Sequence, residues 1–241
     1  MAHLFTALWN KGYAILGIDF ENGFNAMLRQ AMLDAVHKRC SMLTPLVNKF
    51  YARDSLCFFV VDGEARVVLS QEGSRMGCVL GSFAFDCVVE DIYEGAQALL
   101  PEAVVKALTD DLNTAVPPQE SVQEQLRLCG QLFTAIRSEA ERVAGLAVNM
   151  DKTKLLLPLK PDGQPHDLDT LAIPEDFPAE LKVNATGMKV GGAPVGTDAF
   201  VHSFVADTLE EYKERILALP GMGATACCAC ACPRPLSSCR R

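Results

Sequence analysis

Short apolar runs separated by turn residues dominate the first part of the chain. Residues 14–20 predict a buried strand that carries Asp19 at its end and runs into the turn signal 21–23. From Phe24 onward, apolar residues recur at intervals of three and one, which predicts one helix that ends near Arg39. Asp19 therefore lies at the mouth of a strand–turn–helix unit, where an acid has no packing reason to be.

Two hairpins are predicted next. Residues 56–61 and 66–69 flank Asp62-Gly63, a strong signal for a tight β-hairpin. In the second hairpin, 104–116, the adjacent carboxylates of Asp110 and Asp111 fall between two β-favouring segments. Taken alone, this pair is explained by a turn, because Asp tolerates the backbone angles that turns need.

Between and after these hairpins the pattern predicts further elements. A glycine-bearing loop at 71–78 precedes a helix, and a glycine loop before a helix suits close approach to a phosphate. The remaining predictions are a helix at 122–143 ending near Gly145, a turn and strand at 146–157, an exposed linker at 158–178, a small hairpin at 181–190, a loop at 191–196 and a helix at 197–219.

Composition indicates an ordinary globular protein of 241 residues, with 49% hydrophobic and 22% charged residues. No apolar run approaches the roughly 20 residues of a membrane helix, and no signal peptide is evident, so we expect an intracellular protein, cytoplasmic or nuclear. The net charge of −8 is unfavourable for gripping a phosphate backbone. We therefore expect the main nucleic-acid-binding surface to be weak or missing.

The ten cysteines fall into two groups. Five lie within apolar patterns, which favours buried free thiols, and five lie in the last fifteen residues. Cys227 and Cys230 have the local spacing of a zinc ligand pair, but no second pair and no histidine follow. An unstructured tail, or a reading-frame artefact, is the better interpretation of 221–241.

The acidic residues acquire a chemical interpretation when they are considered together. Two-metal nucleotidyl transfer needs carboxylates on adjacent strands that hold two cations about 4 Å apart. Asp19 at the end of one strand and Asp110 in a neighbouring hairpin turn satisfy that requirement.

Five motifs in order over about residues 14–200 resemble the palm of a reverse transcriptase (an RNA-directed DNA polymerase), of the type found in non-LTR retrotransposons. They are the Asp-x4-aromatic motif at 18–25, the glycine motif at 73–80, the x-x-Asp-Asp motif at 108–111, the Asn-x-x-Lys-Thr run within 145–153 and the Gly-x-Pro-x-Gly segment within 191–196. The resemblance implies an α+β polymerase palm, with an antiparallel sheet of ferredoxin-like type, helices packed on one face, and a partial thumb.

The resemblance also implies roles for single residues. Asp19, Asp110 and Asp111 would bind two Mg²⁺ ions, or Mn²⁺ in their place, with Asp111 as the accessory acid. Lys152 would protonate the leaving pyrophosphate or neutralise its charge.

The substrate contacts follow from the same motifs. The Phe20 carbonyl would complete a metal shell, and Phe24 would lie under the sugar of the incoming nucleotide. Met76 and Gly77 would line the template pocket. Each of these residues also has a purely structural interpretation: core packing for Phe24, a solvated turn for Lys152 and a helix-entry glycine for Gly77.

The resemblance implies three partners, which are an RNA template, a DNA primer and a deoxynucleoside triphosphate, and it implies no membrane.

The sequence departs from the family pattern at Met76, where glutamine is usual, and at Leu108, where an aromatic residue is usual. Eighteen residues precede Asp19, so we expect the fingers domain to be absent from this chain. The expected domains are a palm without fingers at 1–158, a linker, hairpin and start of a thumb at 159–220, and the tail at 221–241.

Three functions therefore stay open at this point. The first is templated nucleotidyl transfer to a 3′-hydroxyl by a fragment that is expected to be inactive in isolation, because positioning supplies much of such catalysis. The second is a non-catalytic remnant, or domesticated palm, that acts as a binding or structural protein. The third is another palm enzyme such as a nucleotide cyclase, which would not be expected to carry the motifs at 149–153 and 191–196.

Overall fold

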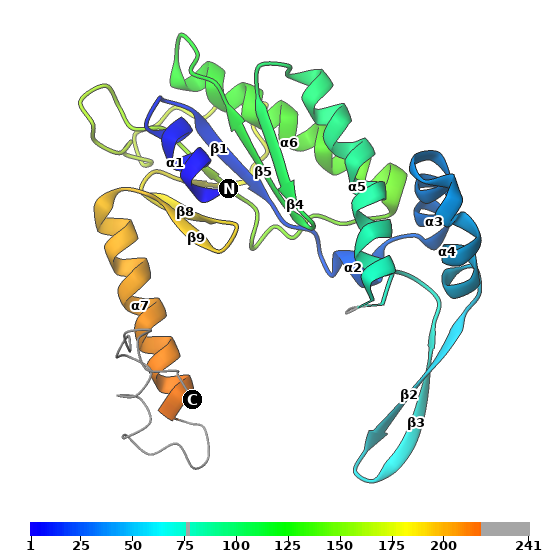
Figure 1. Cartoon of the computed structure of the whole chain (residues 1–241). Coiled ribbons are helices and arrows are strands. Elements are labelled where there is room, and N and C mark those ends of the chain that lie inside the picture. The colour runs from blue at the N-terminus through cyan, green and yellow to red at the C-terminus, as the bar shows by residue number, and fades with distance from the viewer. Residues whose placement is uncertain (76–77, 218–241) are drawn as a thin grey trace, which may run out of the picture. The chain divides into compact units, whose positions relative to one another are not determined.

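The computed structural model describes residues 1–75 and 78–217 (Figure 1). The helices are α1 (Ala2–Trp9), α2 (Gly23–Ala26), α3 (Arg29–Arg39), α4 (Thr44–Tyr51), α5 (Val79–Leu99), α6 (Val122–Ala144) and α7 (Asp198–Leu217), with a 3₁₀ turn, η1, at Ser41–Leu43. The strands are β1 (Ala14–Ile18), β2 (Ser55–Val61), β3 (Glu64–Ser70), β4 (Val104–Leu108), β5 (Asp111–Val116), β6 (Lys154–Leu156), β7 (Lys182–Asn184), β8 (Gly187–Val190) and β9 (Ala193–Gly196).

The main sheet has the order β4-β5-β1-β6-β7. Its first four strands pair antiparallel, and with α5 between β1 and β4 and α6 between β5 and β6 they form the βαββαβ arrangement predicted from the sequence. The prediction of a wholly antiparallel sheet is wrong at one edge, because β7 pairs parallel with β6. The sheet is therefore mixed.

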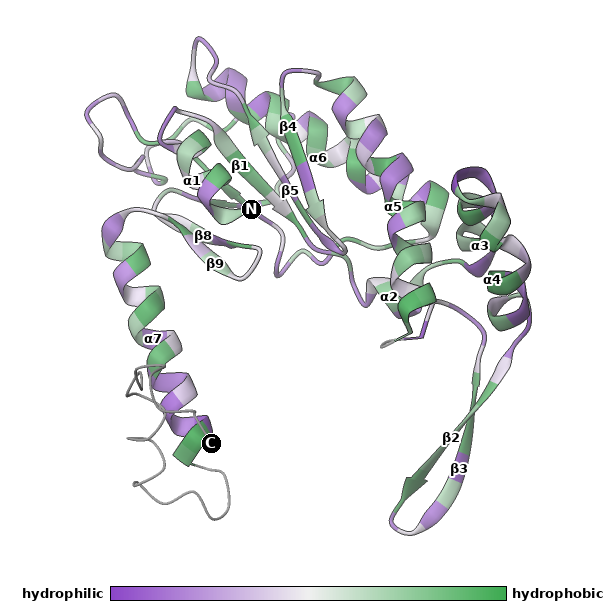
Figure 2. Ribbon diagram, viewed as in Figure 1, coloured by the Kyte–Doolittle hydropathy of each residue, from purple (hydrophilic) through white to green (hydrophobic). Residues whose placement is uncertain are grey.

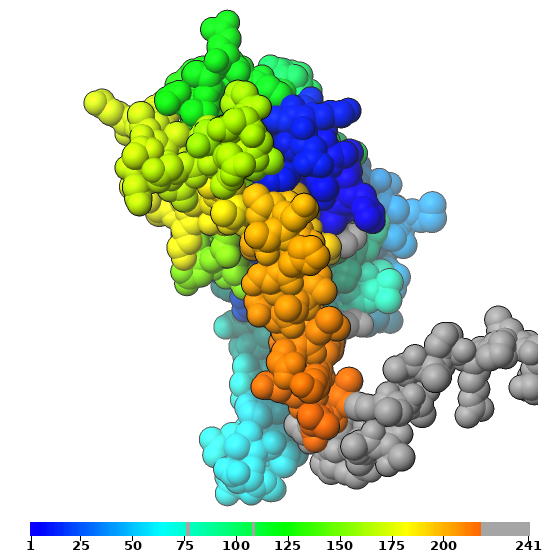
Figure 3. Space-filling model, turned by 90° about the vertical axis from the view of Figure 1, so that its left-hand side faces the viewer, coloured from blue at the N-terminus to red at the C-terminus, as the bar shows by residue number. Residues whose placement is uncertain are grey.

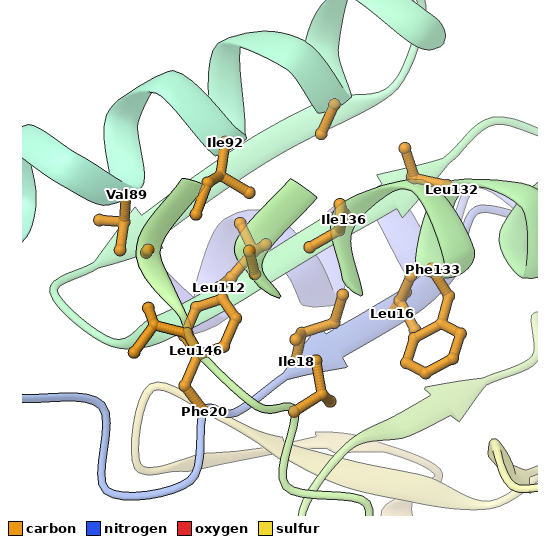
Figure 4. Packing of buried hydrophobic residues seen from close by; sticks show 14 of the residues in the cluster. Leu16, Ile18, Phe20, Val89, Ile92, Leu112, Leu132, Phe133, Ile136 and Leu146 are labelled. Carbon is orange, nitrogen blue, oxygen red and sulfur yellow. The ribbon is translucent and has the colours of Figure 1, made fainter. Parts of the chain in front are cut away.

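One face of the sheet packs against α5 and α6 (Figures 1 and 4). Leu16 and Ile18 of β1 and Leu112 of β5 are buried there against Ile92 of α5 and Phe133 of α6. The hydroxyl of Ser121 accepts the Glu124 N–H at the start of α6, and Gly145 ends the helix at φ +66°. The predicted long helix with a glycine stop is confirmed.

The opposite face of the sheet is also covered, so the prediction of helices on one face alone is incomplete. Phe5 and Trp9 of α1 and Met188 of β8 bury Ile15 of β1, together with Ala115, Leu156, Val190 and Val195. The Trp9 indole donates a hydrogen bond of 2.7 Å to the Leu157 carbonyl. Figure 3 shows α1 (blue) at the surface beside the segment that follows β6 (yellow-green).

Two predicted elements differ from the structure. The helix predicted from Phe24 to Arg39 is broken after Ala26, where the Leu28 N–H leaves the helical pattern and donates to the Ala144 carbonyl. The hairpin predicted within 181–190 does not form. Instead β7 joins the main sheet, while β8 pairs with β9 around a Gly191-Gly192 turn whose positive φ angles suit glycine.

Strands β2 and β3 form the predicted hairpin, with Asp62 and Gly63 both at positive φ in the turn. Figure 2 shows hydrophobic residues along both strands. Many of them are exposed, including Phe58 at 71%. Arg29 of α3 anchors the base of the hairpin, because its guanidinium donates hydrogen bonds to the Ser70 hydroxyl and the Gly73 carbonyl.

The chain divides into two compact units, one spanning Met1–Gly196 and the other beginning at Thr197. In the second unit, α7 begins after Thr197, whose hydroxyl accepts the Phe200 N–H, as predicted. The domain limits expected at 158/159 and 220/221 stay predictions. Met76, Gly77 and the cysteine-rich segment 221–241 lie outside the described residues. Among the helices that are described, none is both long enough and apolar enough to cross a membrane.

Candidate active site at the ends of β1 and β5

Asp19 directly follows β1 and is fixed through its backbone. Its N–H donates to the hydroxyl of Thr153, at 3.2 Å, and its carbonyl accepts the Asn149 N–H, at 2.8 Å. Thr153 is fully buried. The segment before β6 therefore holds the end of β1 in place and aims the Asp19 side chain away from the core.

The same segment presents Lys152. The side-chain oxygen of Asn149 accepts the backbone N–H groups of Asp151 and Lys152, which closes the turn. Lys152 Nζ lies 3.4 Å from Asp19 Oδ1, an ion pair without the geometry of a hydrogen bond. Asp19 Oδ1 is accordingly one of two buried side-chain atoms without a hydrogen-bond partner among the described residues, the other being Thr114 Oγ1.

Asp110 lies in the turn between β4 and β5, and Asp111 is the first residue of β5. Leu108 pairs with Asp111, so Thr109 and Asp110 form the turn itself. Thr109 has φ +58°, an unfavourable backbone for a β-branched residue, and its carbonyl accepts the Tyr93 hydroxyl at 3.2 Å. Helix α5 thus fixes the strained turn that carries Asp110 and precedes Asp111.

The register of the sheet brings Asp19 and Asp111 to neighbouring positions. Ile18 and Leu112 form the last pair of the ladder, and Asp19 follows Ile18 while Asp111 precedes Leu112. Burial, and then the negative charges of Asp110 and Asp19, raise the pKa of Asp111, and the ammonium groups of Lys189 and Lys152 oppose that increase. Asp111 and Asp19 are therefore close enough to repel each other.

Asp110 is half-buried, and its charge also acts on helix α5. Burial raises the pKa of Asp86, with further contributions from Glu90 and Asp110. Burial likewise raises the pKa of the Tyr93 phenol, and Asp110 adds to that effect. The two adjacent acids thus have different surroundings, Asp111 beside Asp19 and Asp110 beside α5. Asp110, which the sequence predicted as the partner of Asp19, is not among the residues that line the cavity over Asp19.

A cavity of about 530 Å³ lies over these residues. Asp19, Asp111 and Asp151 line it together with Lys152, Lys154 and Lys189, so three lysines offset three aspartates. The floor of the cavity also includes Gly17 of β1 and Asn113 of β5. One wall is formed by Met188 of β8 and the Gly191-Gly192 turn. The acidic net charge of the chain does not extend to this cavity.

The donor set suits a hard divalent cation. Asp19 offers a buried oxygen that has no hydrogen-bond partner, and Asp111 offers a second carboxylate on the adjoining strand. Within the described residues, no group of three histidine, cysteine, aspartate or glutamate side chains is arranged to hold a metal. Mg²⁺ is usually bound by one or two carboxylates plus substrate phosphates rather than by an all-protein cage. The residues present fit that mode of binding.

The two aromatic residues predicted at the site pack in the protein interior. Phe20 is buried against the core beside Leu146 (Figure 4) and forms an isolated bridge with Val148. Phe24 stacks on buried Phe85, with ring centroids 4.5 Å apart. Neither residue lines the cavity around Asp19. This packing accounts for Phe24 without a substrate contact.

Several site residues were missed from the sequence. Asn113, Lys154 and Lys189 line the cavity, and Thr153 anchors Asp19. Strand alternation identifies Asn113 in retrospect, because it lies two residues after Asp111 on the same face of β5. Lys189 has no comparable local signal, since its position depends on the pairing of β8 with β9.

No protein-family model matches the sequence, and no curated protein matches it significantly. Among solved structures, apo telomerase from Candida tropicalis, truncated from its C-terminal domain, aligns over 78% of this chain with 10% identity and a TM-score of 0.46. Telomerase from Candida albicans in complex with a TWJ fragment of telomeric RNA aligns over 78% of this chain with 11% identity and a TM-score of 0.40. The chain spans about a third of each, 34% and 30% respectively. At these scores the two structures are distant likenesses to this chain and carry no assignment of residues.

Proposed function

We propose that this chain is a reverse-transcriptase-like palm of the non-LTR retroelement type. Its reaction is transfer of a nucleotide to the 3′-hydroxyl of a DNA primer, directed by an RNA template. The observation that carries the proposal is the placement of Asp19 and Asp111 at neighbouring ends of β1 and β5, with Lys152 in an ion pair with Asp19.

In this proposal Asp19, Asp110 and Asp111 hold Mg²⁺, for which Mn²⁺ is the expected substitute. The bound cations supply charge stabilisation to the attacking oxygen and to the leaving pyrophosphate. The 3′-hydroxyl attacks the α-phosphorus of the nucleoside triphosphate, a new phosphorus–oxygen bond forms, and the bond to pyrophosphate breaks.

The chain's own residues act on position and protons. Thr153 and Asn149 fix the backbone at Asp19, so its carboxylate keeps one orientation while substrates bind. The Lys152 side chain is 67% exposed and reaches the same carboxylate. It is placed to give a proton to the departing pyrophosphate oxygen or to neutralise its charge.

A second candidate is a non-catalytic remnant that has kept the palm fold as a binding or structural protein. The stacking of Phe24 on Phe85, away from the cavity, favours it, because a residue that screens the sugar must face the nucleotide. The departures at Met76 and Leu108 point in the same direction.

Primer extension on an RNA template with Mg²⁺ tests the proposal. Where the unmodified chain extends the primer, Asp19→Asn and Asp111→Asn should each lose at least about 100-fold, because each substitution removes a charge that the transition state needs. Asp110→Asn measures the share of the third carboxylate. Asp169→Asn, in the exposed loop before β7, is the matched control and should extend as well as the unmodified chain.

The remnant makes the opposite prediction. A chain that melts cooperatively but extends no primer with either Mg²⁺ or Mn²⁺ would support the remnant and reject the polymerase. Extension that survives in Asp19→Asn would place the chemistry somewhere other than this cavity.

A further inference from the structure

The β2–β3 hairpin has one face that is wholly apolar. Side chains alternate along each strand, and the register of the two strands brings three residues of β2 opposite three of β3 on this face. The apolar face consists of Leu56, Phe58, Val60, Ala65, Val67 and Leu69. All six residues are exposed, with Phe58 at 71% and Val60 at 70%. The opposite face is mixed and carries the ion pair between Glu64 and Arg66.

The apolar face has no cover among the residues that the structure describes. Beyond its base, the hairpin packs on no other helix or strand of that part of the chain, and Figure 1 shows it extending away from the main sheet. A two-stranded hairpin alone is at best marginally stable in water, and a contiguous exposed apolar patch is typical of an interaction surface. We therefore expect the apolar face to be covered by a partner.

The two ends of the hairpin carry opposite net charge. The tip has two acids, Asp62 and Glu64, against Arg66, which gives a net charge of −1. The base has a net charge of +1 from three arginines and two acids, which are Arg29, Arg53, Arg75, Asp54 and Glu72. Two hairpins packed antiparallel would place each tip over the other base, where the net charges attract. The acidic tip disfavours an anionic membrane or a nucleic acid as the partner.

We infer that the apolar face docks a second copy of this chain, with the two hairpins packed face to face and antiparallel about a two-fold axis near Phe58. A two-fold interface presents the same surface from both copies, and a face without charge is complementary to itself. Phe58 is the middle residue of the β2 row and pairs with Val67, the middle residue of the β3 row. The axis therefore brings the two Phe58 rings to the centre of the interface, where aromatic side chains contribute most.

This interface is separate from the proposed reaction. No residue of the apolar face lines the cavity over Asp19. Six side chains are few beside the roughly 20–30 residues that each partner contributes to a standard interface, so we expect a dissociation constant in the micromolar range. Unfolding measured at submicromolar chain concentration accordingly reports the single chain, with the apolar face exposed.

Sedimentation velocity of the full chain over a series of concentrations tests the inference. Phe58→Asp places a carboxylate at the centre of the interface and should raise the dissociation constant of the dimer by at least about tenfold, because the charge would have to lose its water. Phe59→Asp is the matched control, since Phe59 is the next residue of β2 and lies on the opposite face. It should leave the dissociation constant unchanged. Thermal melts check that both variants fold.

A charge exchange tests the antiparallel arrangement. Glu64→Arg at the tip and Arg53→Glu at the base should each raise the dissociation constant about threefold at low salt, because exposed ion pairs contribute modestly. The double variant should restore the affinity of the unmodified chain, and high salt should remove all three differences. Single variants that weaken the dimer without rescue in the double variant would overturn the antiparallel packing.

Three further results would overturn the inference as a whole. The first is a chain that sediments as a monomer up to its highest soluble concentration. The second is a dimer that forms equally well in Phe58→Asp, which would place the interface elsewhere. The third is flotation of the unmodified chain, but not of Phe58→Asp, with vesicles of phosphatidylcholine and phosphatidylserine, which would assign the apolar face to lipid.

Discussion

The two faces of the β1–β5 pair are both covered, but they carry different residues. On the helix side, Leu16, Ile18 and Leu112 continue an apolar surface to the ends of the strands. On the other side, the apolar residues Ile15 and Ala115 give way to the polar floor and then to carboxylates. Alternate residues of the same strands thus divide between holding the fold and forming the site.

This comparison predicts a large stability effect on the helix side. Leu16 is fully buried, so Leu16→Ala removes buried methyl groups and leaves a cavity, at a cost of about 2–5 kcal/mol in unfolding free energy. Urea unfolding measures the change. The same substitution at Leu56, which is 60% exposed on the β2–β3 hairpin, should change stability by no more than about 0.5 kcal/mol. Equal losses at the two positions would contradict the burial described for the sheet.

Thr153→Val should reduce both the stability of the fold and the activity of the site. The substitution keeps the volume at a buried position but leaves the Asp19 N–H without its acceptor, which should cost about 1–3 kcal/mol. We also expect primer extension to fall, because the carboxylate of Asp19 loses its fixed backbone. Thr170→Val, in the exposed loop before β7, serves as the control. A variant with unchanged stability and activity would remove Thr153 from the site.

Gly17→Ala should separate stability from function. The added methyl meets the mobile end of Met188, and replacing glycine also lowers the entropy of the unfolded chain, so the net change in stability should stay within about 1 kcal/mol. The methyl group nevertheless lies against Met188 and Asn113 in the lining of the cavity that holds Asp19 and Asp111, so primer extension should fall. Gly95→Ala, at an open position in α5, should stabilise the fold and leave extension unchanged.

Local patterns predicted the elements better than their partners. The Asp-Gly turn identified the β2–β3 hairpin, and the period of α6 with Gly145 at its end was correct. The assignment failed at 181–190, where the residues predict one hairpin, whereas β7 pairs with the main sheet and Met188 and Val190 of β8 pack on its face. The unbroken helix after Phe24 failed for a similar reason, a backbone bond from Leu28 to the distant Ala144.

The site was predictable to the extent that strand ends carry its residues. Asp19 follows from an apolar run that ends in an acid, whereas Asp110, Asp111 and Lys152 were assigned through the motif resemblance. Asp19, Asp111 and Lys152 line one cavity, but Asp110, which was expected to be the partner of Asp19, does not line it. The orientation of Phe24 was not predictable, because stacking on Phe85 depends on where α5 lies. The sequence marks Asn113 only as an ordinary strand residue, and its place in the cavity lining depends on the packing of β8 over β1.

The smallest effect concerns the stability cost of the carboxylates themselves. Burial and the neighbouring acids raise the pKa of Asp111 in the folded chain above its value in the unfolded chain. The folded state therefore binds the proton more tightly, so ionisation of Asp111 destabilises the fold at neutral pH, and this penalty disappears once the pH falls below the unfolded pKa.

Asp111→Asn should accordingly give a small increase in Tm at pH 7 that vanishes in acid. Thermal melts of the variant and the unmodified chain from about pH 3 to pH 8 measure it, with Asp169→Asn as a surface control. Lys189→Gln should act in the opposite sense, because loss of its ammonium group raises the Asp111 pKa further and lowers Tm at neutral pH. If the increase in Tm of Asp111→Asn were the same at every pH, packing and not charge would be its cause. The two faces of β5 would then differ in how well their side chains pack and not in charge.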